Sequence, residues 1–193
     1  VLSENIGHLG ELFAIKVNKG IFTSSNGLIK IDNSYYKLVP LSFSKQGQYV
    51  MFEDTKIFIQ NKDFGESRIT ITNNALVNLS DEDKDRTIRE SKIINKALQT
   101  YSKKMKPTFS FISPVDGIIS SRYGKKRFIN NSPRSPHLAL DIAAPEGTKV
   151  LSPEDGKVIL IGNFFYSGNF LIIDHGQGLL SSYSHLSSIS VSK

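Results

Sequence analysis

Asn169-Phe170-Leu171-Ile172-Ile173 and Leu179-Leu180-Ser181-Ser182-Tyr183-Ser184-His185-Leu186 are two strand-like runs, and Gly176-Gln177-Gly178 forms a corner between them. β-Branched and aromatic residues favour strands, whereas glycines favour the tight turn that separates two strands. Further runs of the same kind occupy residues 117–121 and 157–161. We therefore expect the C-terminal half of the chain to form an antiparallel β-sheet.

The N-terminal part also reads as short strands separated by turn-forming residues. Runs rich in β-branched and aromatic residues lie at 12–17, 27–31, 35–39, 56–60 and 68–72. The last two runs alternate with a period of two, as half-buried strands do. Residues 1–80 are therefore expected to form a small β domain, either a sandwich or an open barrel.

One helix is expected between the two β-rich parts. Ser80-Asp81-Glu82-Asp83 is typical of a helix start, because a capping serine and acidic residues suit its N-terminus. Apolar residues then recur with roughly helical spacing, and Pro107 ends the pattern. We expect a helix from Asp81 to about Lys103 within a linking segment at 81–106. The whole chain is then mainly β, with a C-terminal domain at 107–193.

The composition limits the classes of protein to which this chain can belong. The chain has 193 residues, 39% of them hydrophobic, no cysteine, and a formal net charge of +6. The absence of cysteine excludes disulfides and thiolate ligands, and no run approaches the roughly 20 apolar residues of a transmembrane segment. The positive charge suggests an anionic partner. The lysine and arginine clusters lack interleaved aromatic residues, so nucleic acid is not the expected partner. Oligomeric state is not indicated.

His137 and Asp141 are the first candidates for chemistry. On a helix, positions i and i+4 share a face at about 6 Å, which suits one metal ion. On a strand they also share a face, but at about 3.3 Å per residue the strand would have to bend to bring them together. In the strand alternative, Leu138 and Leu140 would face a core. The spacing alone leaves both conformations open. His175 follows a strand, and we expect it to hydrogen-bond the turn or the neighbouring carboxylate.

A family resemblance adds to this reading of the residues. Ser135-Pro136-His137-Leu138-Ala139-Leu140-Asp141-Ile142-Ala143-Ala144-Pro145-Glu146-Gly147-Thr148 resembles the first metal motif of the lysostaphin-type, or LytM-type, zinc endopeptidases. The similarity continues in order through residues 150–158 and 168–176. It reaches Tyr183-Ser184-His185-Leu186-Ser187, which is similar to the Tyr-x-His-Leu segment of that family. Residues 77–83 also resemble the interdomain segment of Gram-negative members that carry an N-terminal β domain.

The resemblance implies an endopeptidase that cuts peptide stems or cross-links of peptidoglycan in the periplasm or elsewhere in the cell envelope. His137 and Asp141 would be ligands of Zn²⁺, and His185 would be the catalytic residue that orients or deprotonates water or stabilises the oxyanion. Arg122 and Arg134 flank this region, and either could bind the carboxylates of the peptidoglycan peptide. A simple surface position is equally compatible with each arginine.

One part of the family pattern is missing. The family supplies a third ligand and a second catalytic histidine from a His-x-His pair, which this chain lacks. We expect that pair beyond Lys193, so the peptidase domain looks incomplete, and a chain ending there would be inactive without its third ligand. The alternative is a non-catalytic, degenerate LytM-type regulator that binds a partner amidase or peptidoglycan. A third hypothesis is a β-rich module that binds anionic polymers. The N-terminal domain could position substrate, contact a partner or cover the cleft.

Overall fold

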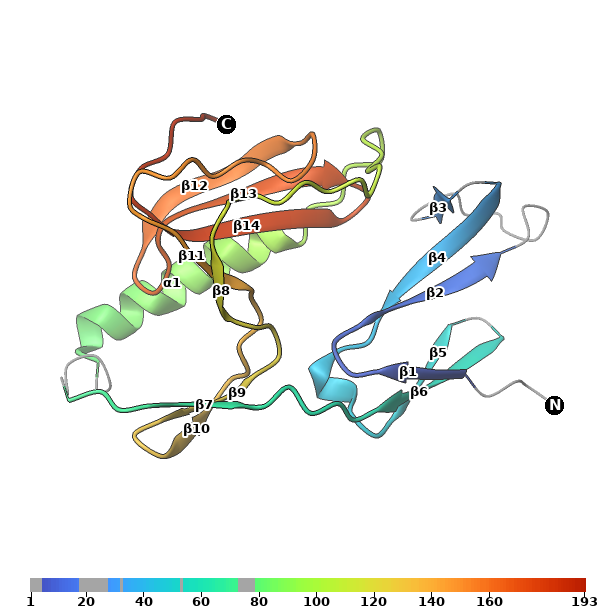
Figure 1. Ribbon diagram of the computed structural model, residues 1–193, viewed down its shortest axis with the longest axis horizontal. Coiled ribbons are helices and arrows are strands. Elements are labelled where there is room, and N and C mark those ends of the chain that lie inside the picture. The colour runs from blue at the N-terminus through green and yellow to red at the C-terminus, as the bar shows by residue number, and fades with distance from the viewer. Residues whose placement is uncertain (1–4, 18–27, 32, 53, 73–78) are drawn as a thin grey trace. The chain divides into compact units, whose positions relative to one another are not determined.

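The computed structural model describes residues 5–17, 28–31, 33–52, 54–72 and 79–193, and within them the chain forms strands β1 to β14 and helix α1 (Figure 1). The mainly β architecture expected from the sequence is confirmed. The chain divides into two compact units, each made of separated segments. The first unit comprises Val1–Ser67, Arg122–Phe128 and Pro133–Ala139, and the second comprises Arg68–Ser121, Ile129–Ser132 and Leu140–Lys193. The domain boundaries expected near residues 80 and 107 stay predictions.

Two small sheets form most of the first unit. One has the order β1-β6-β5, in which β1 (Asn5–His8) runs parallel to β6 (Thr55–Gln60) and β5 (Tyr49–Phe52) runs antiparallel to β6. The other has the order β2-β4-β3 and is antiparallel, with β2 at Leu12–Val17, β4 at Ser34–Pro40 and β3 at Leu28–Ile31. A short 3-10 helix at Phe43–Lys45 follows β4. Gly27, which the sequence placed at the start of β3, lies outside the described residues.

The core of the first unit confirms the alternation seen in the sequence. Ile57 and Ile59 of β6 are both 0% exposed, whereas Phe58, the residue between them, is less buried. Buried Leu9, Val39 and Leu41 complete the cluster. Burying side chains of this size stabilises a fold by about 1.5–3 kcal/mol each. The period of two therefore correctly identified the face of β6 that packs inward.

Strands β7 (Glu66–Ile69), β9 (Lys126–Ile129) and β10 (Ser132–Arg134) form a further sheet in the order β10-β9-β7. The limits between the two units fall within these strands. The strand predicted at 68–72 is wrong in its bounds, because β7 ends at Ile69. Ile71 instead pairs with a side chain: its N–H donates to Asn130 Oδ1 at 2.9 Å, and its carbonyl accepts from Asn130 Nδ2 at 3.0 Å.

The main sheet of the second unit is the antiparallel one that the sequence predicted. Its order is β12-β13-β14, with β12 at Lys157–Phe164, β13 at Gly168–Gly176 and β14 at Leu179–Leu186. Gln177, flanked by two glycines with positive φ, turns the chain from β13 into β14. The inner face of this sheet carries a buried cluster made of Leu160, Phe164, Phe170 and Ile172.

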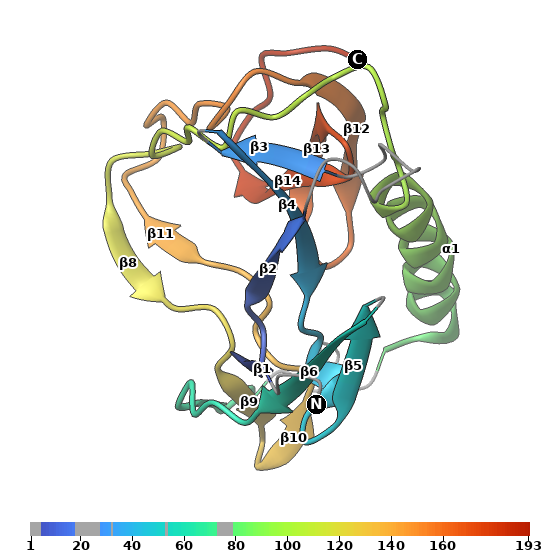
Figure 2. The same ribbon diagram turned by 90° about the vertical axis from the view of Figure 1, so that its right-hand side faces the viewer.

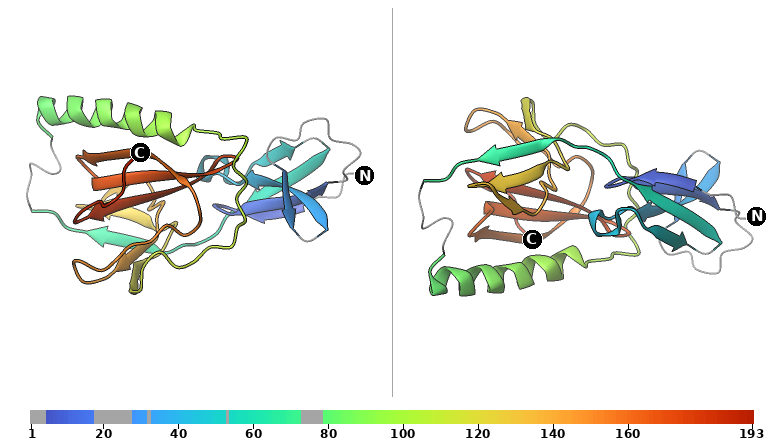
Figure 3. Two further views of the ribbon diagram at one scale, coloured as in Figure 1. Left: turned by 90° about the horizontal axis from the view of Figure 1, so that it is seen from above. Right: turned by 90° about the horizontal axis from the view of Figure 1, so that it is seen from below.

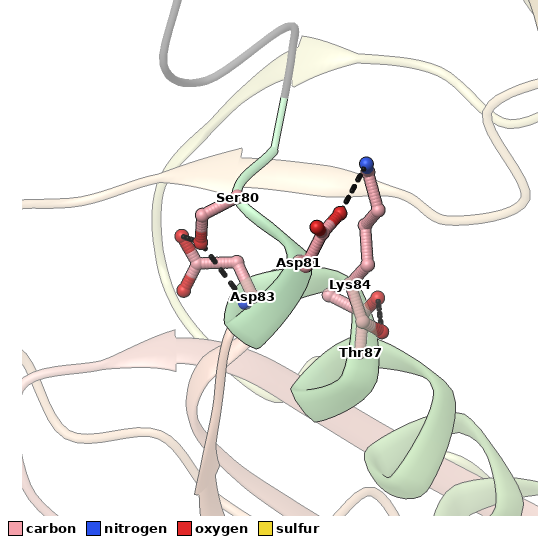
Figure 4. Close-up of polar contacts among 5 residues, drawn as sticks. All are labelled: Ser80, Asp81, Asp83, Lys84 and Thr87. Carbon is pink, nitrogen blue, oxygen red and sulfur yellow. Dashed lines mark hydrogen bonds and ion pairs between the residues drawn. The ribbon is translucent and has the colours of Figure 1, made fainter.

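Helix α1 (Asp81–Leu98) begins where the sequence predicted, and Figure 4 shows its N-terminal contacts. Ser80 Oγ accepts the N–H of Asp83 at 3.1 Å and donates to the carboxylate of Asp83 at 2.9 Å. Lys84 Nζ lies 2.9 Å from Asp81 Oδ1, and Thr87 Oγ1 donates to the carbonyl of Lys84 at 2.8 Å. The bond to Ser80 Oγ satisfies the N–H of Asp83, a backbone donor that a helix start otherwise leaves without a partner.

The predicted end of the helix near Lys103 is wrong, because α1 ends at Leu98. The residues that follow bond to the second unit's sheet instead of continuing the helix. Ser102 Oγ donates to the carboxylate of Asp174, and the Ser102 carbonyl accepts the N–H of Gln177 at 2.9 Å. Tertiary hydrogen bonds therefore override the helical pattern of residues 99–103.

Helix α1 lies along the main sheet of its unit, as both views in Figure 3 show. Ile94 and Ala97 pack against the buried cluster of that sheet. Glu90 Oε2 also accepts the N–H of Phe165, at the turn between β12 and β13, at 2.6 Å. The helix therefore anchors the end of the β12–β13 hairpin as well as its inner face.

Strands β8 (Ile118–Ser121) and β11 (Asp141–Ala143) form a separate antiparallel pair (Figure 2). Their register shifts between Asp141 and Ile142. Residues 135–140, just before β11, form neither the helix nor the strand that the sequence left open. The expectation that Leu138 and Leu140 face a core is wrong, since they are 60% and 51% exposed. The chain there follows an irregular path, so alternation does not apply.

Candidate metal and catalytic site

His137 lies in the first unit and is held by a neighbouring turn of the same unit. Its side chain is only 7% exposed. Its N–H donates to the carbonyl of Lys125 at 2.9 Å, and its carbonyl accepts the N–H of Gly124 at 2.7 Å. Ring atom Nδ1 lies 3.2 Å from the carbonyl oxygen of Arg122. Both the backbone and the ring of His137 are therefore fixed by residues 122–125.

The contact with Arg122 also determines which ring nitrogen of His137 carries the proton. A carbonyl oxygen only accepts hydrogen bonds, so Nδ1 must be the donor in this pair. A neutral imidazole protonated at Nδ1 has its lone pair on Nε2, the nitrogen that would bind a metal ion. Metal-binding histidines usually donate their second N–H to a carbonyl or a carboxylate. The surroundings of His137 therefore fit the role of a metal ligand.

Asp141 lies in the second unit at the start of β11, and its side chain is exposed. Its carbonyl accepts a long hydrogen bond of 3.4 Å from Ser120 Oγ, and it pairs with Ser121 in the strand register. A carboxylate oxygen is an accepted zinc ligand. The register shift between Asp141 and Ile142 locally bends the strand that presents this carboxylate.

His185 lies in β14, has an exposed side chain and adopts the left-handed conformation with φ of 60°. Non-glycine residues rarely adopt this conformation, and such backbone strain is concentrated at functional sites. Its N–H donates to the carbonyl of Ser167 at 2.8 Å. Asn169 Nδ2 donates to the carbonyls of the two residues that follow His185, which are Leu186 at 2.9 Å and Ser187 at 3.0 Å. The backbone on both sides of His185 is therefore anchored to the β12–β13 hairpin.

His175 has a structural role, as the sequence favoured, but its ring bonds residues other than the expected turn and neighbouring carboxylate. The residue is 2% exposed. Its Nδ1 lies 2.9 Å from the carbonyl of Asp155, and its Nε2 lies 2.8 Å from Ser181 Oγ. Burial raises the pKa of the nearby Tyr183 hydroxyl, and hydrogen bonds with Ser181 and Ser152 offset this only in part. His175 thus ties the loop before β12 to strand β14.

Arg122 and Arg134 both lie in the first unit and are exposed. Arg134 ends β10, and Arg122 contributes its carbonyl to the contact with His137. Their proposed contacts with substrate carboxylates stay predictions. The backbone role of Arg122 had no signal in the sequence, because it depends on the path of the chain and not on the side chain.

The structure places the predicted site residues in two units, with the predicted ligand His137 in the first and the predicted ligand Asp141 and catalytic His185 in the second. Within the part of the chain that the structure describes, no three His, Cys, Asp or Glu side chains gather into a metal-binding group. The described residues also contain no helix long and apolar enough to cross a membrane. Asn169, which sequence reasoning missed, could have been noticed only by its place at the start of a strand.

Known proteins resemble this chain in the same region. Residues 135–193 match the model of peptidase family M23. The peptidoglycan DD-endopeptidase ShyA of Vibrio cholerae is 40% identical over 83 residues, which are 42% of this chain and 19% of that protein. The peptidoglycan DD-endopeptidase ShyB of the same organism is 43% identical over 58 residues, 30% of this chain and 14% of that protein. The matched part thus spans less than a fifth of either relative.

A solved structure is similar over nearly the whole chain. It is a crystal structure of a protein assigned to peptidase M23 from Pseudomonas aeruginosa, with a TM-score of 0.70 and 26% sequence identity. The similarity covers 95% of this chain and 75% of that one. The LytM-type resemblance read from the motifs is therefore confirmed. The region that carries this resemblance is residues 135–193, the segment that matches the model of peptidase family M23.

Proposed function

We propose that this protein is a zinc-dependent endopeptidase that cuts peptide stems or cross-links of peptidoglycan in the cell envelope, in the periplasm of a Gram-negative cell. The observation that carries the proposal is that the segment matching family M23, residues 135–193, contains His137, Asp141 and His185. The names of two relatives, both peptidoglycan DD-endopeptidases, supply the class of substrate.

His137 and Asp141 are the residues that would hold the metal ion. The Nδ1 contact of His137 with the Arg122 carbonyl suits an imidazole ligand, and the exposed carboxylate of Asp141 suits an oxygen ligand. A bound zinc ion supplies a Lewis acid that polarises a carbonyl and lowers the pKa of water toward about 7. The buried surroundings of His137 limit the freedom of its ring, which suits a metal ligand.

His185 would move the proton of the attacking water. An imidazole can both accept and donate a proton, which suits this role. The exposed ring can reach solvent and substrate, while the backbone is held by Ser167 and Asn169. Arg122 and Arg134 would bind carboxylates of the peptide, for which a guanidinium offers two parallel donors.

The test is cleavage of cross-linked muropeptides by the intact protein, followed by chromatography of the products. We expect His137→Ala and Asp141→Ala each to lower the rate by at least a hundredfold. His8→Ala is a matched control, because His8 is an exposed histidine whose contact is with Glu11. Chelation should abolish cleavage and added zinc should restore it. Unchanged cleavage by His137→Ala would refute the proposal, and binding of peptidoglycan without cleavage by wild type would instead favour a degenerate regulator.

A further inference from the structure

The segment that carries His137 is grouped with the N-terminal residues of the chain. Arg122–Phe128 and Pro133–Ala139 belong to the same compact unit as Val1–Ser67. In the sequence, however, both segments lie within the region that was expected to form the peptidase domain. The N-terminal residues are thus part of the framework around one predicted metal ligand.

Three aromatic rings join the N-terminal residues to this segment, and we call Phe43, Phe64 and Tyr123 the aromatic cluster. The ring centroids of Phe43 and Phe64 are 5.6 Å apart. The Tyr123 ring lies 5.7 Å from Phe43 and 6.0 Å from Phe64, edge-on to both. These separations are typical of favourable aromatic contacts. Each ring therefore touches the other two, and Tyr123 is the member next to Arg122 and Gly124.

Gly124 fits closely against the same cluster. It is buried and has a φ of +89°, and a Cβ atom at this position would overlap the ring of Phe64. A larger residue would therefore displace either the ring or the backbone at 124. A backbone bond also lies nearby, since the N–H of Lys126 donates to the carbonyl of Gly65 at 3.0 Å. Phe64 and Gly65 thus contact two successive parts of the turn at residues 123–126.

That turn contacts His137 directly. Gly124 N–H donates to the His137 carbonyl, Lys125 accepts the His137 N–H, and the Arg122 carbonyl faces Nδ1. A shift of the turn would move all three partners of His137 together. The chain of contacts therefore runs from Phe64 to Gly124 and from Gly124 to His137.

We infer that Phe64, Tyr123 and Gly124 are positioning residues for His137, and that the N-terminal residues support a metal ligand through the aromatic cluster. This inference rests on the proposed function for the role of His137, but its structural part does not. A cluster that only filled a gap would stabilise the first unit without altering the properties of His137. Positioning instead predicts an effect at His137 that exceeds the effect elsewhere in the same unit.

The experiment compares Gly124→Ala with Gly47→Ala in the intact protein. Both glycines have positive φ, but the added Cβ meets Phe64 at position 124 and nothing within 4 Å at position 47. We expect Gly124→Ala to speed hydrogen exchange of the backbone amides at positions 137 and 124 at least tenfold. Exchange at Ile57, in the core of the first unit, should stay near wild type in both variants. A zinc competition assay with a chromophoric chelator should show affinity at least tenfold weaker for Gly124→Ala and near wild type for Gly47→Ala.

A second pair of variants tests the inference even if Gly124→Ala fails to fold. Phe64→Ala should reproduce the changes at His137, and Phe64→Tyr, which keeps the ring, should restore wild-type exchange and zinc affinity. The inference is overturned if exchange at His137 is unchanged in Gly124→Ala and Phe64→Ala, or if it rises equally at Ile57. Absence of zinc binding in the wild type would refute the proposed function alone, because the exchange measurement needs no metal.

Discussion

Asn169 Nδ2 lies 2.9 Å from the carbonyl oxygen of Leu186, and the same nitrogen lies 3.0 Å from the carbonyl of Ser187. One amide at the start of β13 therefore holds the backbone just after His185, which itself adopts φ of 60°. The strained conformation of His185 needs surrounding structure to maintain it. Asn169 supplies part of that structure from the neighbouring strand.

Asn169→Ala should therefore destabilise the protein and lower its activity. The substitution removes two hydrogen bonds and leaves two carbonyls without this donor. It should lower the unfolding free energy by about 1–3 kcal/mol. Urea denaturation gives this loss, and cleavage kinetics should show a fall mainly in kcat. Asn163→Ala is the control, because Asn163 is exposed and contacts Asn169 Oδ1 without reaching His185's neighbours. Equal effects of the two substitutions would contradict the assigned role.

The helix cap gives a prediction about stability alone. Ser80→Ala removes the acceptor for Asp83 N–H and should lower the unfolding free energy by about 0.5–2 kcal/mol. Ser80→Asn should retain most of the stability, because asparagine is an equally good cap. Thermal unfolding followed by circular dichroism at 222 nm, a helix-sensitive wavelength, tests both variants. A fully stable Ser80→Ala would show that the cap contributes nothing measurable.

Patterns that depend on neighbours in sequence predicted the fold well. The bounds of β2 follow from its β-branched and aromatic run, those of β14 were read from a strand-like run after a glycine turn, and the start of α1 follows from Ser80 and the acids after it. The end of α1 could not be predicted in this way. It depends on hydrogen bonds between Ser102 and residues more than seventy positions later, which no local pattern encodes.

The candidate site shows the same limit. The motifs identified His137, Asp141 and His185 as a set, because the order of several short segments is specific to a family. The surroundings of His137 were not visible in the sequence, since a backbone carbonyl at Arg122 and a close fit at Gly124 depend on the path of the chain. The strand interpretation placed Leu138 in a core, but Leu138 is exposed. Tertiary contacts at His137 replace regular structure there, so the alternation of a strand does not apply.

Buried His175 gives a further test of the second unit. Ser181→Ala would remove the hydroxyl 2.8 Å from His175 Nε2 and leave that nitrogen buried without this partner. An unsatisfied buried polar atom costs about 1–3 kcal/mol. We expect a loss of this size in urea denaturation, whereas Ser182→Ala, at the exposed neighbouring position, should change the unfolding free energy by less than about 0.5 kcal/mol. A stable Ser181→Ala would mean that His175 finds another acceptor or donor.

Glu90 makes the stability of the second unit depend on pH. Burial opposes ionisation of its carboxyl, but the N–H of Phe165 and the guanidinium of Arg86 outweigh burial and hold its pKa below the ordinary 4.5. Protons therefore bind the unfolded state more readily than the folded state. The stability that Glu90 contributes is fully present above about pH 5 and is lost as the pH falls through the lower pKa of the folded state.

Glu90→Gln should accordingly be less stable than wild type by about 1 kcal/mol at pH 7, and the difference should shrink as the pH falls below 4.5. Urea midpoints measured from pH 3 to pH 7 give this difference directly. Asp85→Asn is the matched control, because Asp85 is an exposed acid of the same helix and its replacement should change the unfolding free energy at pH 7 by less than about 0.5 kcal/mol. A gap that is constant across the pH range would contradict the role of the Glu90 charge. Because Phe165 starts the turn whose Ser167 carbonyl accepts the N–H of His185, cleavage by Glu90→Gln at pH 7 should also fall by a few fold.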